Sequence, residues 1–176
     1  LDVSEQLEWI RNVPQHEQRT PEWFVFRQNL LSASSLSNVF KSDATRKSLR
    51  KEKVSPSKYR SSPATEFGNR FEPIAQAIYE KMTDTTISEY GCIKHKNIDH
   101  IGASPDGIVT DATDKSMIGR MLEIKCLYSR KLTGLPKYDY WVQVQMQLEV
   151  CDLEYCDFFE CKLKEFCEYE TFLYII

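Results

Sequence analysis

Apolar residues recur at intervals of three and four along several stretches of the chain, which is the spacing of a helix that buries one face. This pattern predicts helices over residues 4–11, 21–30, 64–81 and 138–150. The second of these begins at Thr20-Pro21-Glu22, which offers an N-cap threonine, a proline at the first position and an acid in the first turn. Pro73 lies inside the third, so a kink or a later start near Arg70 is expected there.

Two side-chain patterns refine the expected helices. Apolar residues follow Ser34 at helical spacing up to Phe40, so Ser34 is expected to be the N-cap of a further helix. In the helix over 138–150, buried sides are expected to be filled by Trp141, Val144 and Leu148 together with Val142 and Met146.

Alternation of apolar and polar residues predicts strands over 85–96, 101–110, 120–127 and 157–162. Residues 97–100 should form a turn, 111–119 a polar hairpin loop and 128–137 a loop. The last segment, 169–176, fits either a strand or the start of a helix.

The stretch from Ser104 to Lys125 carries the most distinctive chemistry. Glu123 and Lys125 are two residues apart on one expected strand, so their side chains share a face. Asp106 lies near the preceding strand, 17 residues earlier. Two carboxylates from paired strands, with a lysine beside them, can hold a hard cation such as Mg²⁺ and orient a water. The plainer interpretation, a solvated strand face and an Asp-Gly turn, stays open on these residues alone.

Composition narrows the class of protein. The 176 residues suffice for one domain with its own core, and 41% hydrophobic with 28% charged residues is typical of a soluble globular protein. No apolar run approaches the roughly 20 residues that span a membrane. No signal peptide is evident, although the chain begins at Leu1 rather than Met, so an N-terminal piece could be missing. An intracellular protein, in the cytoplasm or nucleus of a host cell and not secreted, is expected.

The cysteines and histidines offer no separate site. Six cysteines are present, none in a Cys-x-x-Cys pair, and no histidine lies at zinc-ligand spacing. A reduced protein whose cysteines are small core residues is therefore expected.

Charge is distributed unevenly around a net value of −3. Residues 41–60 contain eight basic and two acidic residues, so this segment carries +6 and the rest of the chain −9. Such a segment, with Arg46, Lys47, Arg50 and Lys51 at its centre, is a candidate phosphate-binding surface, or else a solvated loop. It is expected to be irregular or weakly helical. The acidic residues Glu149, Asp152, Glu154, Asp157 and Glu160 are expected to face water or a partner.

Four motifs in one order resemble a known family. Ser104-Pro105-Asp106-Gly107 followed by Leu122-Glu123-Ile124-Lys125 is similar to the Asp…Glu-x-Lys core of restriction-endonuclease-like nucleases, within them the phage lambda exonuclease and YqaJ-like viral recombinase branch. Three further motifs resemble that branch. The first combines Trp23 and Arg27 with Ser32-Ala33-Ser34, the second runs from Gly68 to Glu72-Pro73, and the third is Tyr140-Trp141-Val142-Gln143-Val144-Gln145.

The resemblance implies a fold and a mechanism. The fold is α/β, a mixed central sheet flanked by helices, in one nuclease domain over 1–176, with an N-terminal helical part (1–60) and a catalytic core (61–176). The metal ligands implied are Asp106, Glu123 and the main-chain carbonyl of Ile124, with Glu72 acting directly or through water, around Mg²⁺ for which Mn²⁺ can substitute. Lys125, helped by Gln143, positions the attacking water. The DNA and its 5′-phosphate are assigned to Arg27, Ser34, Ser35, Ser104 and Tyr140.

The implied activity is that of a 5′→3′ double-strand DNA exonuclease of a viral recombination system, acting on free ends. A single-strand annealing protein and a homo-oligomer are further partners that the family suggests, and no membrane is. Three alternatives stay open: an endonuclease or RNase on the same core, a nucleic-acid-binding module with a silent site, and a recombinase-adaptor domain.

Overall fold

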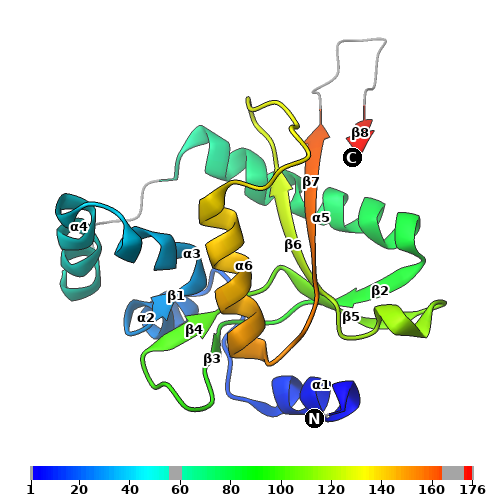
Figure 1. Cartoon of the computed structure of the whole chain (residues 1–176), viewed down its shortest axis with the longest axis horizontal. Coiled ribbons are helices and arrows are strands. Elements are labelled where there is room, and N and C mark those ends of the chain that lie inside the picture. Colours follow the sequence, from blue (N-terminus) through cyan, green and yellow to red (C-terminus); the bar gives the residue numbers. More distant parts are fainter. Residues whose placement is uncertain (1, 56–60, 164–172, 176) are drawn as a thin grey trace.

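The computed structural model describes residues 2–55, 61–163 and 173–175. In the described part of the chain, four helices longer than one turn, α1, α2, α4 and α5, precede the last helix, α6 (Figure 1). The bounds of the helices are α1 (Val3–Asn12), α2 (Pro21–Gln28), α3 (Ala33–Leu36), α4 (Asp43–Val54), α5 (Pro63–Thr83) and α6 (Tyr138–Cys151), with 3₁₀ turns η1 (Ser37–Phe40) and η2 (Lys115–Met117).

The strands form two mixed sheets. The larger has the order β2-β5-β6-β7-β8, in which only β6 and β7 run parallel. The smaller has the order β1-β4-β3, with β1 parallel to β4. The bounds are β1 (Leu31–Ser32), β2 (Thr85–Ser88), β3 (Ile93–Lys94), β4 (Ile101–Ala103), β5 (Gly107–Ala112), β6 (Met121–Cys126), β7 (Cys156–Leu163) and β8 (Leu173–Ile175). The predicted α/β fold, in which helices flank a mixed sheet, is confirmed, and its strands are divided between two sheets rather than forming one.

Helices α5 and α6 cover opposite faces of β6, as Figure 1 shows with α6 in front of the sheet and α5 behind it. Leu122 and Ile124 pack into a core with Ala75 and Tyr79 of α5. Met121 packs into the other core, with Met146 and Val150 of α6. The predicted division of β6 into two faces is confirmed, and it turns Glu123, on the same face as Met121, toward α6. The strand is not half-buried as its alternation suggested, because Met121 to Ile124 are all buried.

The basic segment was expected to be irregular or weakly helical, and this is wrong for its described part. Residues 43–54 form the regular helix α4, whose N-cap Ser42 accepts a hydrogen bond from the Thr45 N–H. Arginine and lysine are good helix formers, and Leu49 gives the helix a buried anchor. Lys58 and Arg60 lie outside the described residues.

Helix α5 begins at Pro63, so the later start near Arg70 is wrong. Ser62 caps it by accepting a hydrogen bond from the Thr65 N–H, and Pro63 occupies a position whose N–H needs no partner. Strong start signals and packing against the sheet hold the helix continuous through Pro73.

Two predicted strands are each divided between the two sheets. The strand expected over 85–96 is split into β2 and β3, and the one over 101–110 into β4 and β5. At the first break Gly91 lies against the His16 backbone, where an added Cβ would come within 2.0 Å of the His16 carbonyl oxygen. At the second break lies Asp106, which therefore sits in a connection between sheets.

Other local expectations fail in part. Trp141 was expected to be buried but is 51% exposed. The loop expected over 111–119 begins as strand and contains η2, which Asp114 caps. Glu160 is buried against Arg130, and Asp157 accepts hydrogen bonds from Tyr79 and Arg120, so these two acids do not simply face water. Part of 169–176 is strand β8, and the remainder lies outside the described residues. Among the helices described, none has the length and apolar character needed to span a bilayer.

Candidate active site

Glu123 is held by donors from two elements. Its carboxylate is 1% exposed and pairs with Lys125 Nζ from the same strand face. Helix α6 adds two amides: Gln143 Nε2 donates to Oε1 at 2.6 Å and Gln147 Nε2 to Oε2 at 2.7 Å. A buried carboxylate with three donors is not a solvated strand face, so the plainer interpretation of Glu-x-Lys is wrong here.

Asp106 reaches the same place from the connection before β5. Its Oδ2 accepts the backbone N–H of Ile124 at 2.7 Å, which locks the carboxylate against the middle of β6. Burial, and then repulsion from Glu123, raise the pKa of Asp106 well above its ordinary value. Burial lowers the pKa of Lys125, but attraction to Glu123 and Asp106 outweighs it and leaves that pKa raised. A positive charge placed beside these two carboxylates would therefore be stabilised.

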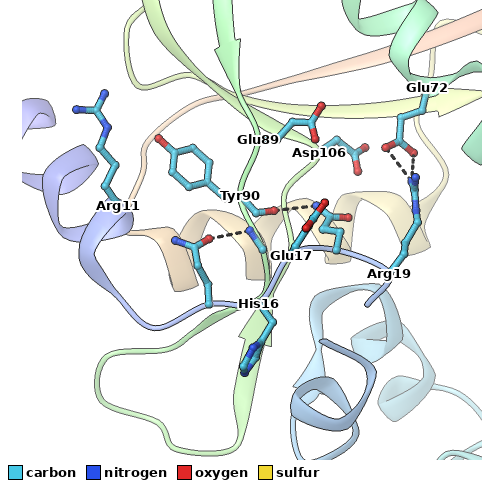
Figure 2. A pocket seen from close by; sticks show the side chains of 11 residues that line it. Arg11, His16, Glu17, Arg19, Glu72, Glu89, Tyr90 and Asp106 are labelled. Carbon is cyan, nitrogen blue, oxygen red and sulfur yellow. Dashed lines mark hydrogen bonds and ion pairs between the residues drawn. The ribbon is translucent and has the colours of Figure 1, made fainter. Parts of the chain in front are cut away.

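Glu72 extends from α5 toward the same region but is turned to another partner. Arg19 Nη2 lies 3.0 Å from each of its carboxylate oxygens. Figure 2 shows Arg19 reaching up to Glu72, with Asp106 beside them. Desolvation raises the pKa of Glu72 despite this arginine.

One cavity of about 590 Å³, hereafter the active-site cavity, joins most of the predicted site residues. It is lined by Arg27, Ser34, Glu72, Ser104, Asp106, Glu123, Lys125 and Gln143, among others. Residues from α2, α3, α5, α6 and β6 therefore converge although they are far apart in sequence.

The chemistry of Asp106 and Glu123 suits a hard divalent cation. Buried Glu123 and half-buried Asp106 offer carboxylate oxygens whose mutual repulsion a cation would relieve. Within the described residues, however, no group of three or more His, Cys, Asp or Glu side chains is placed to hold a metal ion. Glu72, engaged with Arg19, does not complete the cluster as it stands.

Arg27 and its serines form the other end of the cavity. The guanidinium lies 4.1 Å from the centre of the Trp23 ring and its Nη2 donates to Ser34 Oγ at 3.0 Å. Ser32 Oγ lies 3.3 Å from Ser34 Oγ and donates to Ser35 Oγ at 3.2 Å. Hydroxyls and a guanidinium in one place are suitable donors for a phosphate.

Ser34 is not the helix cap that the sequence predicted. Helix α3 begins at Ala33, so the N-cap position belongs to Ser32. The chain stays extended up to Ser32 because β1 pairs with β4 through the Leu31 N–H and the His100 carbonyl at 2.7 Å.

Ser104 adds a buried hydroxyl to the cavity. Its Oγ is enclosed, with the buried Cys92 thiol as a weak partner, and its carbonyl accepts Gln147 Nε2 at 3.4 Å. A buried polar atom of this kind is costly unless a ligand or water serves it.

Tyr140 lies between two cations beside the active-site cavity. Its ring centre is 5.2 Å from Lys125 Nζ and 5.6 Å from the Arg130 guanidinium carbon. Lys125, Arg130, Lys137 and Tyr140 line an adjoining cavity of about 580 Å³, so a basic surface continues from the carboxylates past the start of α6.

The four central basic residues of α4 are not part of the active-site cavity. Lys47, Arg50 and Lys51 are exposed, and Arg46 is paired with Asp43. The helix is nevertheless tied to the phosphate end, because Lys53 Nζ donates to the Arg27 carbonyl at 3.1 Å. Desolvation, and then Arg27, lower the pKa of Lys53.

Three residues at the site are absent from the sequence prediction. Gln147 lies four residues after Gln143 on the same helix face, a spacing that could have revealed it. Ser32 lies within the predicted serine motif and lines the cavity. Arg19 gave no signal, because its contact with Glu72 spans 53 residues.

The sequence of this chain matches the model of a known protein family and one curated relative. The model of the YqaJ-like viral recombinase domain matches residues 22–154. An uncharacterised protein of Acanthamoeba polyphaga mimivirus is 32% identical over 185 aligned positions, which cover 95% of this chain and 33% of that protein. The chain thus spans about a third of the length of this curated relative.

Two crystal structures are similar in fold and sequence. One is of the alkaline exonuclease LHK-Exo from Laribacter hongkongensis, with a TM-score of 0.69 and 29% identity, covering 89% of this chain and 81% of that one. The other is of LHK-Exo in complex with dAMP, with a TM-score of 0.67 and 31% identity, covering 80% and 73% respectively.

Proposed function

The chain belongs to the YqaJ-like viral recombinase domain family, and we propose that it is a metal-dependent 5′→3′ double-strand DNA exonuclease. The family resemblance expected from the four motifs is thereby confirmed. The observation that carries the proposed activity is one cavity in which Asp106, Glu123 and Lys125 lie together with Arg27 and Ser34. The likeness to an alkaline exonuclease over most of the chain supports it.

Mg²⁺, or Mn²⁺ in its place, would be held by Asp106 and Glu123, with the main-chain carbonyl of Ile124 as a third oxygen. When bound, it would supply positive charge that offsets the charge developing on the phosphate. Gln143 and Gln147 hold both oxygens of Glu123, so this carboxylate keeps one orientation. Glu72 would turn from Arg19 to complete the acidic cluster directly or through water.

Lys125 would act on the attacking water. Its Nζ pairs with Glu123, and attraction to the carboxylates keeps its pKa raised, so it stays an ammonium in this structure. A fixed ammonium orients a water through hydrogen bonds and stabilises negative charge on the phosphate oxygens.

The 5′ polarity would come from the other end of the cavity. Arg27 and Ser34 would hold a terminal phosphate, and Ser104, which lines the same cavity, would offer a further hydroxyl. Ser35 supports the cluster through Ser32 rather than lining the cavity. A terminal phosphate fixed here would bring the first phosphodiester toward the carboxylates.

The test is one Mg²⁺ assay on linear, nicked, closed circular and single-stranded substrates, with an RNA duplex beside them. We expect mononucleotide release from linear duplex DNA and none from closed circles. Cleavage of closed circles would favour an endonuclease on the same core, and cleavage of RNA alone an RNase. Binding to DNA without any cleavage would favour a silent site or an adaptor. Partners beyond DNA, namely an annealing protein or further copies of the chain, remain predictions.

A further inference from the structure

Arg19 is held in a backbone conformation that its side chain does not favour. Its φ is +68°, in the left-handed region that glycine adopts most readily. The turn is fixed on both sides: Gln18 Nε2 donates to the carbonyls of Tyr90 and Pro105 at 2.9 and 3.2 Å, and Thr20 caps α2. The turn is therefore anchored to the residue that precedes Asp106.

The side chain of Arg19 uses only some of its N–H donors. Both of its contacts to Glu72 are made by Nη2. Within the described part of the chain, Nε and Nη1 donate to nothing else, although the guanidinium has five N–H groups. The side chain is 46% exposed, so an incoming ligand can reach it.

Arg19 stands where two cavities meet. It lines the active-site cavity and also a neighbouring cavity of about 520 Å³, and Glu72 and Asp106 line both. Figure 2, which draws the residues of the neighbouring cavity, shows the Arg19 side chain extending to Glu72 with Asp106 nearby. A strand of DNA that passed the carboxylates from one cavity into the other would pass this guanidinium.

We propose that Arg19 binds a backbone phosphate of the DNA next to the one that is cleaved, and that Glu72 holds it in place in the DNA-free protein. This inference rests on the proposed nuclease function. A phosphate presents oxygens to a guanidinium as a carboxylate does, and a bidentate contact that includes Nη2 would displace Glu72 from that nitrogen. Glu72 and DNA would then compete for one guanidinium, so loss of the Glu72 charge should strengthen the contribution of Arg19 to DNA binding.

The test measures binding of 5′-phosphorylated linear duplex in EDTA, where no cleavage occurs, over a range of salt concentrations. Arg19→Gly removes the side chain at a φ that glycine accepts without strain, so the fold should be retained. We expect its affinity to fall about tenfold and the salt slope to decrease by about one. Arg19→Lys keeps the charge but not the forked guanidinium, so its affinity for the duplex should lie between those of the wild type and Arg19→Gly.

Two further variants complete the design. Lys115→Ala removes an equal charge from an exposed ion pair with Asp111, outside the lining of both cavities, and should leave binding unchanged. In a Glu72→Gln background, Arg19→Gly should cost more affinity than it does in the wild type, because the competing carboxylate is gone.

The outcomes separate this inference from the proposed function. If the wild type cleaves linear duplex but Arg19→Gly binds it as tightly as wild type in EDTA, Arg19 only positions Glu72 and the inference is overturned. Equal losses in the two Glu72 backgrounds overturn the competition. If the wild type neither binds nor cleaves duplex DNA, both the inference and the proposed function fail.

Discussion

At the scale of single residues, the site depends on carboxylates that are buried before any cation arrives. Asp106, in the connection before β5, and Glu123, in β6, repel each other, and Lys125 pairs with Glu123 and attracts both. The separation of these two acids by 17 residues, with a lysine beside the second, left a solvated turn and strand face open as the plainer interpretation. It was the resemblance of four motifs to one family that singled them out as a candidate site. Two glutamine amides and a backbone N–H donate to these carboxylates, which distinguishes them from acids in a solvated turn. These donors are brought there by tertiary packing, so the sequence revealed only some of them.

Asp106→Asn and Glu123→Gln are each expected to abolish cleavage while DNA is bound as well as by wild type or better. Removing a carboxylate removes a ligand and also eases the approach of phosphate. The measurement is Mg²⁺-dependent cleavage beside binding in EDTA. Near wild-type turnover in either variant would show that the cation is held elsewhere.

Asp106 also makes a prediction about pH. Its pKa is raised in the folded protein, so the folded state holds this proton at pH values where the unfolded chain has lost it. The resulting stabilisation is complete below the unfolded value of about 3.9 and is lost as pH rises through the folded pKa. In EDTA, Asp106→Asn should therefore raise the melting temperature relative to wild type at pH 8 more than at pH 4. A difference that is the same at both pH values would show that burial does not perturb this group.

Gln147 tests the support of Glu123. Gln147→Met keeps the volume but removes the donor to Oε2, so kcat should fall about 10- to 100-fold with a smaller change in KM. Gln145→Met is the matched control, since Gln145 is exposed on the same helix. Equal effects of the two substitutions would mean that Gln147 merely fills space.

At the scale of elements, the helices and strands that could be predicted from sequence are those marked by nearby residues, such as caps or a periodic apolar face. Helices α2, α5 and α6 have caps or long periodic faces, and β6 alternates apolar and charged residues, so the existence of these elements was predictable. The burial of both faces of β6 was not, because it depends on the two helices that cover the strand. The division of β2 from β3 and of β4 from β5 was not, because it is set by pairing partners distant in sequence. Asp106 owes its place to that division.

Helix α4 carries an element-scale prediction. Reversing the charges of Arg46, Lys47, Arg50 and Lys51 together should weaken DNA binding and flatten its salt dependence, since fewer counterions are released. These side chains do not line the active-site cavity, so kcat at saturating DNA should change little. As a control, the charges of Lys81 and Lys115 are reversed. Lys81 lies in the last turn of α5 and Lys115 in η2. An unchanged salt slope in the α4 variant would show that the helix is only a solvated surface.

At the scale of the whole molecule, the fold joins two half-sites. The phosphate donors come from α2 and α3 near the smaller sheet, and the carboxylates from β6 and the connection before β5. The sequence indicated both halves but could not show that they share one cavity, because that depends on how α6 bridges the two sheets. The proposed 5′→3′ polarity depends on this junction.

The most direct test of the account compares cleavage of 5′-phosphorylated and 5′-hydroxyl linear duplexes by wild type and Arg27→Ala. Arg27 and Ser34 can make charge-assisted hydrogen bonds to a phosphate that a hydroxyl end cannot make. Wild type should therefore prefer the phosphorylated end, and Arg27→Ala should lose most of that preference while cleavage of the hydroxyl end falls less. Equal rates on the two ends in wild type would contradict the phosphate pocket and the exonuclease polarity built on it.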